Sequence, residues 1–120
     1  MIHLDTNYLI GLAVPGSLPA QSVDKWLANG ERLAASAFVW AEFLNGPVTT
    51  QEIALVESVI EPKLVSFEKR TAVMAAELFN RAGRRRGSRI DCWIAAAAIL
   101  ADAELATENK SDFCHLSRLD

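Results

Sequence analysis

The sequence predicts an α/β fold in which helices cover both faces of a central parallel sheet. Short apolar segments that suit buried strands alternate with longer segments whose apolar residues recur at helical spacing. Chains that alternate strands and helices in this way build parallel sheets between two layers of helices. The 120 residues are enough for one domain of ordinary size. We therefore expect residues 1–120 to form a single three-layer α/β/α sandwich.

Four strands are expected in the sheet, with the first of them at its centre. They cover residues 1–5, 32–37, 63–67 and 103–107. Glycine and proline separate the elements, as at Gly30, at Gly46-Pro47 and at Pro62. Helices are expected over residues 6–13, 20–29, 38–45, 49–60, 68–82, 89–101 and 112–119. Thr49 and Glu52 have the spacing of a capping box at the start of the fourth helix.

The composition excludes several classes of protein. Apolar residues make up 51% of the chain and charged residues 22%, which is typical of a globular protein. The longest apolar run, Cys92–Ala101, is shorter than the ~20 residues that span a membrane, so no membrane association is expected. The first residues lack the basic and apolar regions of a signal peptide. Two cysteines make neither a disulfide framework nor a metal cluster, and we expect a cytoplasmic protein with reduced thiols.

The basic residues are concentrated in one place. The net charge is −3, yet five of the twelve bases fall in one short stretch: Arg81, Arg84, Arg85, Arg86 and Arg89. The cluster has two interpretations. It is either a solvated helix end followed by a loop, or a local site for a phosphate backbone.

Four acidic residues stand in apolar surroundings. Asp5 and Asp112 follow predicted strands, Glu42 is the only charge in an apolar helix, and Asp91 opens the most apolar helix. Each has a plain structural interpretation. Asp5 can cap the next helix, Asp91 can complete a capping box with Ser88, Asp112 can lie in a first helical turn, and Glu42 can face outward.

Taken together, the four acids indicate a metal site. Functional groups of parallel sheets gather beyond the carboxyl ends of the strands, where all four carboxylates can converge. Like charges at close range repel unless a cation neutralises them. Oxygen ligands favour hard cations such as Mg²⁺ or Mn²⁺, and neither His3 nor His115 has a partner at zinc-ligand spacing.

In four places the chain resembles PIN domains, and specifically the VapC-type ribonuclease toxins of toxin–antitoxin pairs. The matching segments are Asp5-Thr6-Asn7, Ala41-Glu42-Phe43, Ile90-Asp91-Cys92-Trp93-Ile94-Ala95-Ala96 and Thr107-x-Asn109-x-x-Asp112-Phe113. Each segment is weak alone, but the four in this order are together specific. The chain departs from the family at Cys92, where alanine is usual. Members of the family commonly continue into a fifth strand. We therefore expect four strands in this chain, with five as the alternative that the resemblance implies.

The resemblance implies a Mg²⁺- or Mn²⁺-dependent endoribonuclease that leaves 5′-phosphate and 3′-hydroxyl ends. The implied catalytic residues are Asp5, Glu42, Asp91 and Asp112. Asp5, Asp91 and Asp112 would hold the metal, while Thr6, Asn7, Thr107 and Asn109 would support them through hydrogen bonds. If the arginine cluster binds a phosphate backbone, Arg84, Arg85, Arg86 and Arg89, which come just before Asp91, are the candidates to hold RNA.

The resemblance also implies a cognate antitoxin and a homodimer. For the antitoxin, the early helices offer apolar anchors around Tyr8, Leu12, Trp26 and Trp40. The alternative is a non-catalytic PIN-like module that binds nucleic acid or acts as a scaffold. A dehalogenase-like phosphatase and a receiver domain are excluded, since Asn7 and Thr6 stand where those proteins need a second acid.

Overall fold

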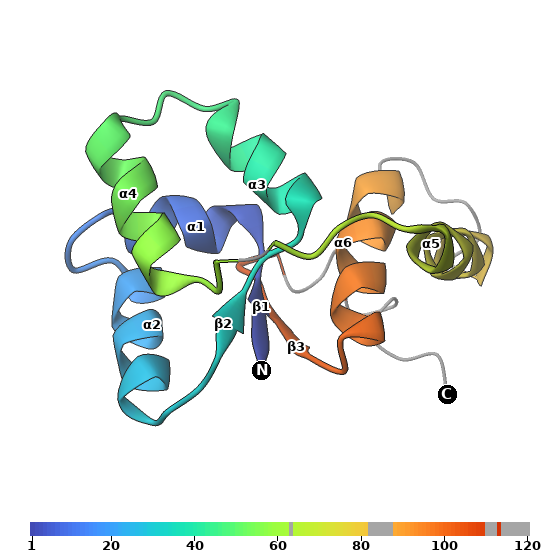
Figure 1. Ribbon diagram of the computed structural model, residues 1–120, viewed down its shortest axis with the longest axis horizontal. Helices are drawn as coiled ribbons and strands as arrows, with labels where there is room; N and C mark the ends of the chain where they lie inside the picture. Colours follow the sequence, from blue (N-terminus) through green and yellow to red (C-terminus); the bar gives the residue numbers. More distant parts are fainter. Residues whose placement is uncertain (63, 82–87, 110–112, 114–120) are drawn as a thin grey trace.

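The computed structural model describes residues 1–62, 64–81, 88–109 and 113. The expected alternation of strands and helices is confirmed over these residues (Figure 1). In order, the elements are β1 (Ile2–Leu4), α1 (Thr6–Leu12), α2 (Leu18–Ala28), β2 (Leu33–Ala34), α3 (Ala37–Leu44), α4 (Thr50–Val59), α5 (Lys69–Arg81), α6 (Ser88–Leu100) and β3 (Glu104–Ala106). Of the last expected helix, 112–119, the structure describes residue 113 alone.

The sheet is parallel and β1 is its central strand, as the sequence predicts. The strand order is β2-β1-β3. Ile2 pairs with Leu33 on one side and with Glu104 on the other, and Leu4 pairs with Ala106. Because the strands are parallel, their carboxyl ends meet at one edge, which is where α1 and α3 begin (Figure 1).

The strand expected over residues 63–67 is wrong: in the described part of this segment, pairing is limited to one parallel bridge, between Val65 and Ser36. Val65 donates its N–H to Ala35 and accepts one from Ala37. Ser36 explains why the pairing is so short. Its side chain caps α3, so the backbone turns into a helix directly after Ala35 and offers no longer edge.

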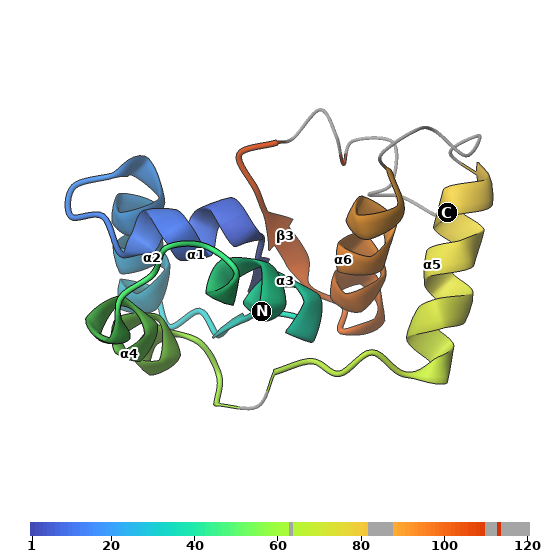
Figure 2. The same cartoon turned by 90° about the horizontal axis from the view of Figure 1, so that it is seen from above.

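Two layers of helices enclose the sheet. Figures 1 and 2 show α1, α2 and α4 on one side and α5 and α6 on the other, with α6 between the sheet and α5. The core between these layers includes the fully buried side chains of Leu4, Leu9, Val39, Phe43 and Leu78. The three-layer sandwich predicted from the sequence is therefore present, with a smaller sheet than expected.

Helix α6 carries the most apolar run of the chain, because the sheet covers it on one side and α5 covers it on the other (Figure 2). Cys92 and Ala96 have no exposed surface, and Ile94, Ala95 and Ala98 are buried as well. Small side chains allow α6 to lie close to both the sheet and α5. Within the described ranges, none of the helices combines the length and the apolar character needed to cross a membrane.

The helix starts follow from local capping. Asp5, Ser17, Ser36 and Thr49 are N-caps of α1, α2, α3 and α4, and the capping box of Thr49 and Glu52 is confirmed. Helix α2 begins before the expected residue 20 because Ser17 caps it and Pro19 fits its first turn, where the N–H that proline lacks has no helical partner.

His3 occupies an apolar position in β1. Its side chain is buried, and its Nε2 atom makes no hydrogen bond to any described residue. Burial, together with the positive charge of the chain's N-terminus, lowers the pKa of this imidazole below its ordinary value. His3 is therefore held neutral near pH 7 and serves as a core side chain.

We expect Gly11→Ala to destabilise the protein, because α1 crosses α2 at Gly11. A Cβ atom there would lie 2.5 Å from Cγ of Pro19, whose ring is too rigid to move aside. Overpacking of this kind costs about 1–3 kcal/mol, against ~1 kcal/mol gained from the higher helix propensity of alanine. Gly46→Ala is the matched control, since its Cβ would make only an ordinary contact at 3.5 Å. Urea unfolding of both variants measures the difference, and equal free energies of unfolding would contradict this account of the crossing.

Candidate active site

A network of polar side chains lies at the carboxyl ends of β1 and β3. Asp5 follows β1 directly and Thr107 follows β3 directly. The backbone N–H of Asp5 donates to the carbonyl of Ala106 at 2.9 Å, so the sheet pairing continues up to the polar residues. The sheet itself therefore sets the distance between Asp5 and Thr107.

The carboxylate of Asp5 is held by three hydrogen bonds. Its Oδ1 accepts the backbone N–H of Thr6 at 2.7 Å. Its Oδ2 accepts the hydroxyl of Thr107 at 2.7 Å and the amide of Asn7 at 3.4 Å. The residue is only 5% exposed. Asp5 thus caps α1, as its plain interpretation predicts, while its second oxygen is oriented by residues of β3 and α1.

Glu42 reaches this network from α3. The hydroxyl of Thr6 donates to Oε1 of Glu42 at 2.6 Å, which places the two acids on either side of one threonine. Glu42 is half-buried, and its carboxylate is directed toward the start of α1. The outward-facing interpretation of Glu42 is therefore wrong, because α3 turns this face toward α1.

Asn7 and Asn109 complete the network between α1 and the segment after β3. Asn7 donates to the Thr107 hydroxyl at 3.4 Å and accepts the backbone N–H of Glu108 at 3.2 Å. Asn109 contributes its backbone N–H, which donates to Oγ1 of Thr107 at 3.0 Å. The part played by Glu108 was missed in the sequence, since a backbone donor leaves no signal in residue type.

Two of the predicted acids come from the later part of the chain. Asp91 lies half-buried in the first turn of α6, while Asp112 lies outside the described residues. Across the described ranges, no three histidine, cysteine or acidic side chains are near enough to hold one metal ion. The expectation that the four carboxylates meet around one cation is thus not met by Asp5, Glu42 and Asp91.

The predicted RNA-binding arginines are divided in the same way. Arg84, Arg85 and Arg86 lie outside the described residues. Arg89 is exposed on α6, with its guanidinium carbon 5.7 Å from the centre of the Phe79 ring. This distance is typical of a cation–π contact.

The donors that are brought together suit Mg²⁺ or Mn²⁺. Asp5 and Glu42 offer carboxylate oxygens, and the groups around them are hydroxyls and amides, which are all hard donors. Mg²⁺ is usually held by one or two carboxylates together with water and substrate phosphates, so a complete protein cage is not required. Oδ1 of Asp5 accepts one hydrogen bond and therefore keeps acceptor capacity for a cation.

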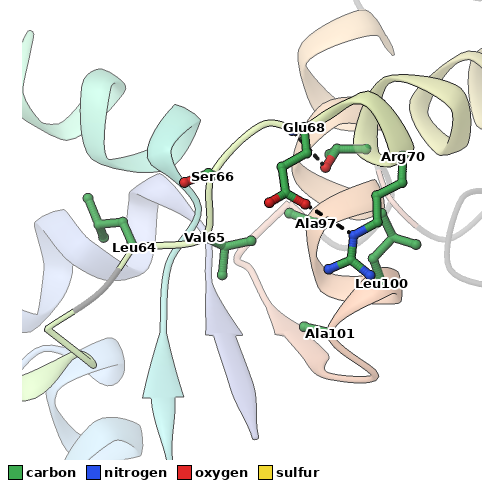
Figure 3. Close-up of a pocket in the computed structure, with 9 residues that line it drawn as sticks. Leu64, Val65, Ser66, Glu68, Arg70, Ala97, Leu100 and Ala101 are labelled. Carbon is green, nitrogen blue, oxygen red and sulfur yellow. Dashed lines mark hydrogen bonds and ion pairs between the residues drawn. The ribbon is translucent and has the colours of Figure 1, made fainter.

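A hollow lies apart from this network, beside the start of α5 and the end of α6 (Figure 3). It has a volume of about 290 Å³, and its walls include Leu64, Val65 and Leu100. Its charged groups, Glu68 and Arg70, form an ion pair at 3.3 Å. Because these charges face each other, this hollow lacks the free acidic groups of a metal site.

The expected antitoxin anchors are partly wrong. Leu12 is buried in the core, and Tyr8 stacks on Trp26 with ring centres 5.8 Å apart. Trp40 is half-buried against Phe43, 5.3 Å away. The helical spacing was correct but could not distinguish the face that packs on the domain from the free face. The large apolar side chains that are exposed on the first two helices and their connection are Ile10, Val14, Leu18 and Leu27.

Comparison with solved structures identifies the same fold elsewhere. VapBC2 from Rickettsia felis, bound to a DNA fragment from its promoter, matches with a TM-score of 0.73 and 24% identity over 95% of this chain and 92% of that chain. FitAcB from Neisseria gonorrhoeae matches with a TM-score of 0.73 and 21% identity over 96% and 92%. VapBC-5 of Mycobacterium tuberculosis, from the VapBC family of toxin–antitoxin systems, gives 0.58 and 23% over 98% and 90%.

At these identities the likeness concerns the fold. No curated protein has a significant sequence match to the chain. The family is established by sequence. The sequence model of the PIN domain family matches residues 2–119, which include every helix and strand named above. The chain therefore belongs to the PIN domain family.

Proposed function

We propose that the protein is a Mg²⁺-dependent endoribonuclease and the toxin of a toxin–antitoxin pair. It would hydrolyse RNA phosphodiester bonds to 5′-phosphate and 3′-hydroxyl ends. The observation that carries the proposal is the fixed carboxylate of Asp5, which is joined through Thr6 to Glu42 at the carboxyl edge of the sheet. Membership of the PIN family and the likeness to VapBC and FitAcB structures support it.

In this proposal Asp5, Asp91 and Asp112 hold Mg²⁺ or Mn²⁺, and Glu42 lies beside them. A divalent ion of this kind supplies charge neutralisation for the phosphate and activation of the attacking water near neutral pH. The sequence places all four acids within the motifs of the family. The reaction is a direct attack by water, with no covalent intermediate on the protein.

The side chains around Asp5 act by keeping its charge in place. Thr107 and Asn7 direct Oδ2, and the N–H of Thr6 directs Oδ1, so the carboxylate needs no rearrangement when it acts. Thr6 does the same for Glu42 through its hydroxyl. Two carboxylates aligned in this way repel a bare phosphate, so RNA would need the arginines of the 84–89 segment to hold its backbone.

The proposed partners follow from the same role. A ribonuclease in the cytoplasm harms its own cell, so a cognate antitoxin would cover the site. The proposed antitoxin surface is the exposed apolar set of the first two helices and their connection, Ile10, Val14, Leu18 and Leu27, because apolar anchors of this kind suit an amphipathic helix. We also propose a homodimer.

We expect Asp5→Asn to reduce RNA cleavage in Mg²⁺ by about 100-fold or more. The amide keeps the shape of the side chain but removes the charge, and losses of this size are usual for groups that act on charge or protons in the reaction. Asp24→Asn, an exposed acid on α2, is the matched control and should cleave normally. Gel analysis of a labelled RNA measures the rate and the product ends.

Chelation with EDTA should also abolish cleavage by the unaltered protein. Activity that persists in EDTA, or products that end in a 2′,3′-cyclic phosphate, would contradict the proposed mechanism. A pure protein that binds RNA without cutting it, with or without Mg²⁺, would favour the scaffold alternative.

We expect expression of the chain alone to arrest growth, and co-expression with the small open reading frame beside its gene to restore growth. The two products should co-purify, because the partner covers the exposed apolar surface. Asp5→Asn expressed alone is the control and should be harmless. Full growth with the unaltered chain alone would contradict the toxin role, even if the protein cleaves RNA in vitro.

A further inference from the structure

An apolar hollow that the proposed chemistry does not use lies between α5 and α6. Its volume is about 200 Å³. Phe67, Phe79 and Trp93 form aromatic walls, Ala72, Ala75 and Ala76 line the α5 side, and Arg89 stands among the lining residues. Sites for whole drug-sized ligands are ~300 Å³ or more, so this hollow has room for a ring system and little else.

The aromatic wall is preorganised. Trp93 lies 4.7 Å from Phe38, with the ring planes inclined by 30°. Phe67 lies at 90° to Phe38 at 4.9 Å and at 67° to Trp93 at 6.0 Å. Although Phe67 takes part in both contacts, it remains 43% exposed. A large aromatic side chain that is both fixed and open to solvent offers a free ring surface for stacking.

Arg89 places a positive charge at the same hollow. Its guanidinium lies over Phe79 at 5.7 Å from the ring centre, and the residue is exposed. Planar aromatic faces beside an exposed arginine provide two complementary contacts for a nucleotide: stacking for the base and an ionic contact for the phosphate. A purely apolar ligand would make no use of the charge.

The hollow lies across α6 from Asp91, one of the proposed site residues. Arg89 and Trp93 are four residues apart, so they share one side of α6, and Asp91 lies between them on the opposite side. Phe38 precedes Glu42 by four residues on α3, so these two share a side of that helix. One helix width, ~10 Å, therefore separates the hollow from Asp91.

We propose that this hollow, the α5–α6 base site, holds one base of single-stranded RNA on the side of α6 that faces away from Asp91. The base stacks on Trp93 and Phe67, and Arg89 contacts a neighbouring phosphate. The proposal rests on the nuclease function proposed above and adds where the substrate is gripped. The walls of the base site are apolar, so the site accepts any base and favours those that stack best.

A second copy of the chain is the competing occupant of these aromatic residues. The small volume and the exposed Arg89 favour RNA, because a phosphate supplies a negative charge for Arg89, whereas the described lining of the hollow offers a second copy no acid to pair with it. The experiment below separates the two occupants.

The test measures RNA binding without cleavage. All variants are made in the Asp5→Asn chain, and fluorescence anisotropy follows a short, labelled single-stranded RNA of mixed sequence. We expect Phe67→Leu and Trp93→Leu each to weaken binding roughly tenfold, which is the size of one lost stacking contact. Phe67→Tyr should restore binding, because tyrosine also stacks. Trp40→Leu is the matched control and should bind normally, because Trp40 lies two residues after Phe38 and therefore on the opposite side of α3.

Two further measurements make the assignment specific. With an RNA that carries abasic positions throughout, the Asp5→Asn chain should bind equally well with and without Phe67→Leu, since no base remains to stack. Arg89→Gln should weaken binding to both RNAs and reduce its salt dependence.

Three outcomes would overturn the base site: no RNA binding by the parent, unchanged affinity in both aromatic variants, or a change of oligomeric state in Phe67→Leu by analytical ultracentrifugation with RNA affinity unchanged. The nuclease proposal fails separately. A chain with intact Asp5 that does not cut RNA, yet loses affinity with Phe67→Leu, keeps the base site and loses the chemistry.

Discussion

The hydrogen bond from Thr107 to Asp5 joins two residues that are 102 positions apart in the sequence, and the candidate site depends on it. It exists because β1 and β3 are parallel neighbours that end at the same height, with Leu4 paired to Ala106. One residue further along each strand, the backbone leaves the sheet and the side chains meet. The sheet register therefore determines the direction in which the Asp5 carboxylate points.

The same residue serves two needs. As N-cap, Asp5 satisfies an N–H of α1 that has no helical partner, which stabilises the helix start. Asp5 is also an acid that is only 5% exposed and lies near Glu42. A buried carboxylate of this kind lowers the stability of the fold unless it is hydrogen-bonded or neutralised. Thr6 links both acids, since its N–H donates to Asp5 and its hydroxyl to Glu42. A single threonine thus controls the geometry of two negative charges.

Much of this arrangement could be predicted from the sequence, because it depends on local signals. The apolar stretch before Asp5, the capping pair at Thr49 and the alanine-rich run after Asp91 indicated β1, α4 and α6 correctly. The strand expected at 63–67 failed because its pairing depends on Ser36, which ends the neighbouring strand by capping α3. Residue type alone does not report such competition.

The sequence also could not predict the direction in which some side chains point. Helical spacing placed Leu12 on an apolar face, but only the packed structure shows that this face is buried. Glu42 was equally compatible with solvent or with the site, and the position of α1 decided between them. The aromatic walls of the α5–α6 base site, Phe67, Phe79 and Trp93, come from three separate segments, so no single stretch of sequence indicates the hollow.

We propose that Asp5, oriented by Thr107, is a ligand for a divalent cation. Isothermal titration calorimetry with Mn²⁺ tests this proposal most directly. The unaltered chain should bind Mn²⁺, and Asp24→Asn should bind it equally. Thr107→Val keeps the size of the side chain but removes the hydroxyl, and it should weaken binding about 10–100-fold, as the loss of a ligand's hydrogen-bond partner does. Asp5→Asn should weaken binding further. Equal Mn²⁺ affinity in all four proteins, each shown to be folded by its unfolding transition, would contradict the account.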